Sequence, residues 1–201
     1  MALVGCQQHV VKQPQPEFVA NKAKYIAPDT AGPVRGTGLE AQDIVGMSDE
    51  IMKDMLSSPG LMNRKTPARI LIDASNFTNE STSRVNLNMI TDRLSASLDR
   101  AAKGKLVFVD RESAAIVARE REMKRSGVVD SGTVRQTKAQ FGVDYSLAAR
   151  ITSHEEVGAN GISSRFHFIA FKMLDQESGA RVYSGYYEVR KAGVDGAVKY
   201  R

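Results

Sequence analysis

The chain has 201 residues, of which 42% are hydrophobic and 25% charged, and its formal net charge is +5. This length fits one domain with a tail, and the apolar content fits an ordinary globular core. The charge is too small to indicate a nucleic-acid interface, but it is compatible with an acidic protein face, a lipid headgroup or an anionic polymer. A single cysteine excludes an internal disulfide, and no stretch approaches the roughly 18 apolar residues of a spanning helix.

The single cysteine, Cys6, directly follows Leu3, Val4 and Gly5. This order is typical of a bacterial lipobox, in which the signal peptide is cut and the new N-terminal cysteine is acylated. A signal peptide also needs a charged region and a longer apolar region, which the residues before Cys6 do not supply. The interpretation therefore requires a longer precursor or a native start other than Met1. The alternative is that Cys6 is a free thiol.

Residues 7–36 show no sustained hydrophobic period and contain four prolines. Such a composition predicts an extended tether, which at about 3.3 Å per residue could reach on the order of 100 Å. The alternative is an arm that docks on a neighbour through Phe18, Tyr25 and Ile26. We therefore divide the chain into a lipobox remnant (1–6), a tether (7–36) and a globular domain (37–201).

The first predicted element of the domain is a helix over residues 37–57. Thr37-Gly38-Leu39-Glu40 has the form of a capping box, and Pro59-Gly60 ends the helix. An apolar stripe recurs at helical spacing through Ile44, Met47, Ile51 and Met55. A methionine-rich face is more often core than a partner-binding surface, because methionine fills irregular gaps.

A strand, a helix and a second strand are expected next. Residues 69–74 form the first strand, and a polar loop follows through Asn76, Asn79 and Ser81. The helix begins at Asn86, ends at Gly104 and has one apolar face, formed by Leu87, Ile90, Leu94, Leu98 and Ala101. The apolar run over residues 105–110 predicts a central strand buried on both faces. This order implies a right-handed parallel crossover.

The rest of the chain predicts two helices and three strands. A charged helix over 112–126 has Ile116, Val117 and Met123 as its few apolar contacts, and a short helix follows over 133–141. Alternation over 145–152, a largely apolar run over 166–174 and a last strand over 182–189 indicate an antiparallel meander. The expected fold class is α/β (α+β), with helices packed on a mixed sheet of about five strands and an extra N-terminal helix.

No catalytic motif is found. The sequence contains no Gly-x-Ser-x-Gly elbow and no Walker loop. His154 and His167 could approach each other across a hairpin, but His9 lies in the tail, so we predict no metal site. Asp73 and Asp110 follow strands and could form a carboxylate pair, although helix capping and turn formation is the simpler interpretation.

A charged cluster lies in the helix over 112–126. Its signs alternate, which is typical of a solvated, self-paired face. Its net excess is basic, so the alternative is a partner-binding face formed by six cations: Arg119, Arg121, Lys124, Arg125, Arg135 and Lys138.

Four stretches carry a resemblance to a known family. They are Ile70-Leu71-Ile72-Asp73 with Asn76 and Asn79, the helix and strand from Asn86 to Val109, and the segments 142–147 and 179–185. Over roughly residues 37–190 the chain resembles the LpoB-like activators of penicillin-binding proteins. These motifs are structural rather than catalytic, so they indicate a fold family better than an activity.

The resemblance implies a Gram-negative lipoprotein held at the periplasmic face of the outer membrane. Its domain would resemble the periplasmic part of CsgG and the N-terminal region of TolB, and would bind and stimulate a peptidoglycan synthase. We therefore expect a non-catalytic protein with no cofactor beyond the lipid on Cys6. Its partner would be an envelope protein, with no nucleic acid involved. The alternative is a structural ring subunit of a secretion channel or flagellar collar, which binds its own copies and other ring subunits. The tether is shorter than in the best-known activators, which favours this alternative.

Lipidation is testable by the intact mass of the protein from its native host. We expect the residues before Cys6 to be absent and the remaining mass to exceed that of the polypeptide by a lipid. A mature protein that retains Met1 contradicts the lipobox interpretation.

Overall fold

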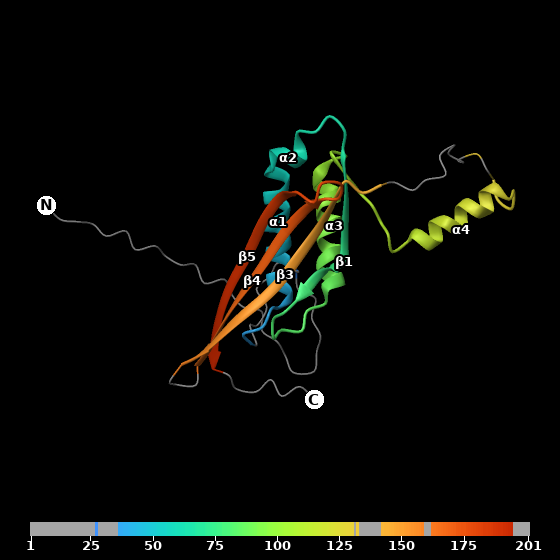
Figure 1. The fold of residues 1–201 in the computed structure, drawn as a ribbon. Helices are drawn as coiled ribbons and strands as arrows, with labels where there is room; N and C mark the ends of the chain where they lie inside the picture. The colour runs from blue at the N-terminus through green and yellow to red at the C-terminus, as the bar shows by residue number, and fades with distance from the viewer. Residues whose placement is uncertain (1–26, 28–35, 131, 133–141, 159–161, 195–201) are drawn as a thin grey trace.

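In the computed structural model, residues 27, 36–130, 132, 142–158 and 162–194 are described. Among them, five strands form one sheet in the order β2-β1-β3-β4-β5, and α1 and α3 cover one of its faces (Figure 1). The expected mixed α/β fold with five strands is confirmed. In chain order the elements are α1 (Ala41–Ser57), α2 (Pro59–Met62), β1 (Ala68–Asn79), α3 (Leu87–Ala102), β2 (Leu106–Phe108), α4 (Ala114–Arg125), β3 (Tyr145–Val157), β4 (Ile162–Asp175) and β5 (Arg181–Val194).

The antiparallel meander β3-β4-β5 is the longest part of the sheet. Its strands have 13 or 14 residues, and the β3-β4 ladder is continuous from Tyr145 opposite Asp175 to Val157 opposite Ser163. The predicted alternation places Tyr145, Leu147, Ala149 and Ile151 in the core. Because side chains on a strand point to alternate faces, the residues between them lie on the opposite face of the sheet.

Strand β1 extends through Asn76 to Asn79, so the predicted polar loop is wrong for these two residues. The ladder with β3 breaks between Ile72 and Phe77 and then resumes as far as Asn79. Phe77 is only 4% exposed and packs edge-on against Phe171 on β4, with ring centroids 6.3 Å apart. The strand bulges away from β3 and then rejoins the sheet, because burial of the Phe77 ring is favourable. The polar residues before Phe77 do not indicate this bulge in the sequence.

Strand β2 lies at the edge of the sheet and not at its centre, so that prediction is also wrong. It pairs in parallel with β1 alone, from Ala68 opposite Leu106 to Ile70 opposite Phe108. Leu106 is buried, whereas Val107 and Phe108 are half-buried. The expected parallel arrangement of the two strands is confirmed.

Helix α1 begins four residues later than expected. Glu40 and Asp43 form its capping box, in which Asp43 Oδ2 accepts a hydrogen bond from the Glu40 N–H at 2.7 Å. Thr37 instead belongs to the segment that leads into the helix. The stripe of Ile44, Met47, Ile51 and Met55 is buried, which confirms the core interpretation. On α3, Ala102 takes the buried place predicted for Ala101.

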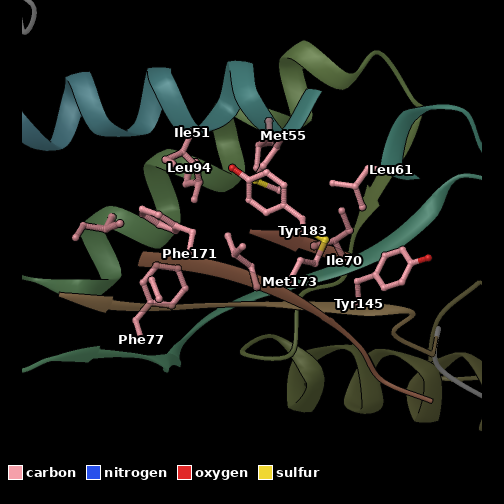
Figure 2. Packing of buried hydrophobic residues seen from close by; sticks show 14 of the residues in the cluster. Ile51, Met55, Leu61, Ile70, Phe77, Leu94, Tyr145, Phe171, Met173 and Tyr183 are labelled. Atoms are coloured by element: carbon pink, nitrogen blue, oxygen red, sulfur yellow. The ribbon is translucent and has the colours of Figure 1, made fainter. Parts of the chain in front are cut away.

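Tyr183 on β5 joins the sheet to α1 inside this core (Figure 2). Its hydroxyl donates to Asp54 Oδ2 at 2.6 Å. Burial and this acceptor raise the pKa of the tyrosine, so it stays a neutral donor. The ring crosses Gly185, where an added Cβ would collide with the Tyr183 hydroxyl and lie 3.0 Å from Asp54 Oδ2. Gly185 is therefore required by the path of this ring.

We expect Gly185→Ala to lower the free energy of unfolding by about 1–3 kcal/mol, because the added methyl overpacks the Tyr183 contact. Urea unfolding measures the change. The matched control is Gly193→Ala on the same strand, where an added Cβ meets nothing within 4 Å. Equal stabilities of the two variants would contradict this role of Gly185.

Candidate functional site

Helix α4 stands apart from the sheet, to which it is joined through the segment after β2 (Figure 1). None of its residues is buried, and Ile116 is 72% exposed. The predicted apolar contacts through Ile116, Val117 and Met123 are therefore not core contacts. The reason is composition, since six of the last seven residues of the helix are charged.

The basic residues of α4 lie among the last seven residues of this helix. Helix α4 contains four arginines and lysines but only two glutamates, so its net charge is positive. Lys124 and Glu120 form an i,i+4 pair at 3.5 Å, while Arg119 and Arg125 are exposed. Cations in the last turn also interact favourably with the helix dipole. The other two predicted cations, Arg135 and Lys138, lie outside the described residues, as does the predicted short helix over 133–141.

The face of the sheet opposite α1 and α3 carries a second group of exposed side chains. Phe168 on β4 stacks on Tyr186 on β5, with ring centroids 5.7 Å apart, and Tyr186 is 60% exposed. Arg150 pairs with Glu80 at 3.4 Å, and Arg190 pairs with Glu156. No described helix covers this open face of β3, β4 and β5.

Asp73 and Asp110 each close a turn of their own. Asp73 Oδ1 accepts from the backbone N–H and the hydroxyl of Ser75, at 2.8 and 2.6 Å. Asp110 accepts in the same way from Ser113, at 3.0 and 2.6 Å, just before α4 begins. These hydrogen bonds hold the pKa of both carboxyl groups below the ordinary value. The turn interpretation is confirmed for both residues.

The two histidines of the meander lie on opposite faces of the sheet. Ser153 is opposite His167 and His154 is opposite Phe166, so the two rings cannot converge on one ion. His154 is exposed near Glu156, whereas His167 is fully buried. Within the described ranges, no three histidine, cysteine or acidic side chains are grouped so that they could hold a metal.

His167 fixes the segment that precedes α1. Its Nε2 lies 2.8 Å from the Thr37 carbonyl oxygen, and its Nδ1 has no partner among the described residues. Lys191 on β5 holds the same segment, because its Nζ donates to the Gly38 carbonyl at 3.0 Å and to Asp43 Oδ2 at 2.5 Å. Thr37 and Gly38 are therefore held in a buried polar clamp formed by β4, β5 and the start of α1.

Burial lowers the pKa of His167 below 6.5, its ordinary value. The hydrogen bond to Thr37 opposes this shift, Arg165 and Lys191 add to it, and Asp43 opposes it. The buried ring is therefore neutral at neutral pH, and its Nε2–H donates to the Thr37 carbonyl.

Comparison with known proteins shows where this architecture belongs. The family model described as "Peptidoglycan-synthase activator LpoB" matches residues 43–189, which span both the helical layer and the meander. The chain belongs to the LpoB family. No curated protein matches it by sequence.

Solved structures similar to this LpoB-family domain share little sequence with it. The LpoB C-terminal domain from Escherichia coli is 18% identical, with a TM-score of 0.44, over 73% of this chain and 98% of that chain. The domain from Salmonella enterica has the same identity and coverage, with a TM-score of 0.42. Lipoprotein GNA1162 from Neisseria meningitidis is 21% identical, with a TM-score of 0.33, over 66% and 88% of the two chains.

The matched segment of this LpoB-family domain includes α4 with its four basic residues, most of the open sheet face, and His167 and Asp43 of the clamp. No helix of the described residues is long and apolar enough to span a bilayer. Sequence reasoning found the cations of α4 but missed the open face and the clamp. The signal for the open face is present in β4, where Phe166 and Phe168 occupy the positions between buried residues.

The clamp predicts a pH-dependent stability. As the pH falls below about 6.5, His167 gains a proton in the unfolded state while the folded ring stays neutral, so the folded state loses stability from that pH downward. His167→Gln keeps a donor for Thr37 but cannot titrate. The loss of unfolding free energy between about pH 7.5 and pH 5, measured in urea, should therefore be smaller in this variant.

The control for this experiment is His154→Gln, which removes an exposed histidine of the neighbouring strand that takes no part in the clamp. If the His167→Gln variant and the wild-type protein lose the same free energy of unfolding over this pH range, His167 is not the source of the pH dependence.

Proposed function

We propose that this protein is a lipid-anchored regulator that binds a peptidoglycan synthase in the periplasm and stimulates it. The observation that carries the proposal is the match of residues 43–189 to the model of peptidoglycan-synthase activators. The lipid on Cys6 holds the protein at the outer membrane, and residues 7–36 span the distance to the partner. The chain itself carries out no chemistry and needs no cofactor.

Helix α4 is the surface that we assign to the synthase. It presents the exposed apolar side chains of Ile116 and Val117 beside the basic half of the helix. Apolar anchors with surrounding charge are the usual composition of a protein-binding patch, where the anchor supplies affinity and the charges supply orientation and association rate. An acidic groove on the synthase is the complementary surface, and Arg135 and Lys138 would extend the contact.

Stimulation follows if the α4 surface binds the active state of the synthase more tightly than the inactive state. A ligand shifts such an equilibrium only by its differential affinity for the two states. The tether raises the local concentration of the domain around its partner, so a small interface is sufficient.

The test is glycan polymerisation by the synthase with and without the lipid-free domain. We expect Arg119→Glu with Arg125→Glu to weaken synthase binding about tenfold, equivalent to about 1.4 kcal/mol, and to reduce stimulation in parallel. The free energy of unfolding should not change, since α4 contributes no buried residue. The matched control is Lys65→Glu with Lys105→Glu, two exposed lysines that lie outside α4.

Two results would contradict the proposal. One is full stimulation by the α4 double variant. The other is a stable high-order ring formed by the lipid-free domain in light scattering, which is what the ring-subunit hypothesis expects. The regulator hypothesis expects a monomer.

A further inference from the structure

The open face of the sheet is hollowed beside the bulge of β1. The hollow has a volume of about 520 Å³, within the roughly 300–1,000 Å³ range of small-molecule sites. Ala148 on β3 and Ala170 on β4 line it, and these small side chains leave its centre open. We call it the open-face depression.

Two irregularities of the sheet shape this depression. Ile72 is opposite Leu147 and Phe77 is opposite Ala149, so four residues of β1 bulge opposite Ala148 alone and deliver Asn76 to one wall. At the other wall, the register of β4 and β5 shifts between Met173 and Leu174, which places Arg181 at the rim. Bulges of this kind often re-aim side chains next to functional sites.

The rim of the depression is cationic. It includes Arg150, which pairs with Glu80, together with Lys172 and Arg181. Within the part of the chain that the structure describes, Lys172 and Arg181 form no ion pair, and the side chains of Asn76 and Ser184 form no hydrogen bond. The depression therefore offers two free cations, a free amide and a free hydroxyl around a floor of small side chains.

This set of groups fits an acidic saccharide better than a folded protein. A narrow concave floor admits a sugar ring or a short chain, whereas a flat protein face would bridge over it. The amide and hydroxyl can bond to sugar hydroxyl and acetamido groups, and the cations can bind carboxylates. The stacked Phe168 and Tyr186 lie on the same face of the sheet, and Phe168 also lines the depression.

We propose that the open-face depression binds the carboxylate-bearing sugar of peptidoglycan, an N-acetylmuramyl unit with its peptide. This inference rests on the proposed function for the presence of that polymer around the domain. The regulator would then contact two components through two surfaces, with α4 on the synthase and the open-face depression on the glycan. Contact with the strand would hold the domain where new glycan is made.

The test is titration of the lipid-free domain with N-acetylmuramyl dipeptide, followed by NMR or calorimetry. We expect saturable binding that weakens with salt, with chemical-shift changes at Ala148, Ala170 and Ser184. Lys172→Ala with Arg181→Ala should weaken binding at least tenfold, equivalent to about 1.4 kcal/mol. Ala148→Leu should block the floor while both cations remain.

The controls separate this inference from the proposed function. Lys65→Ala with Lys105→Ala should bind the dipeptide as the wild-type protein does. The Lys172 and Arg181 variant should still stimulate the synthase on lipid II in solution, and the α4 variant should still bind the dipeptide. Both depression variants are compared with the wild-type protein in urea unfolding, so a loss of binding is scored only in folded protein.

The inference is overturned if the wild-type domain does not bind the dipeptide, or if Ala148→Leu binds it unchanged. It is also overturned if neutral chitobiose binds as tightly, because the cationic rim then has no role. Tighter binding of an acidic peptide without sugar would assign the depression to a protein segment instead.

Discussion

Burial of the sheet on one face only is the constraint on which the rest of this structure depends. Strands β3, β4 and β5 are long, and one side of each packs under α1 and α3 while the other side meets solvent. An antiparallel meander tolerates this arrangement because alternate residues serve alternate faces. The buried face supplies stability, which leaves the open face free to carry aromatic and cationic side chains that a second helical layer would cover.

Polar contacts at two points fix α1 on that sheet. Tyr183 and Asp54 join β5 to the C-terminal half of α1, and Lys191 with Asp43 joins β5 to its first turn. A buried ion pair contributes little net stability against hydrophobic alternatives, but loss of one partner costs several kcal/mol. The hydrogen bond of Tyr183 and the ion pair of Lys191 therefore set the position of α1, and His167 fixes the segment that precedes this helix.

The two candidate surfaces follow from different physical causes. Helix α4 is exposed because its charged residues cannot form an apolar stripe, so it gains nothing from packing on the sheet. The open-face depression exists because β1 leaves its ladder and returns at Phe77, and because alanines face solvent on β3 and β4. The same domain can thus present two surfaces of different shape and similar charge.

The fold class, the apolar face of α1, the parallel pair β1-β2 and the meander follow from the amino-acid sequence, because each rests on a local period that side-chain burial imposes on the chain. The basic character of α4 follows from the sequence as well. Tertiary structure alone decided that β2 is an edge strand, that the polar stretch after Ala74 bulges and rejoins the sheet, and that α4 stands apart. It also decided that His167 clamps Thr37, 130 residues away in the chain. These outcomes depend on which residues, far apart in the chain, pack against the same face of the sheet. A local hydrophobic period carries no information about such long-range packing.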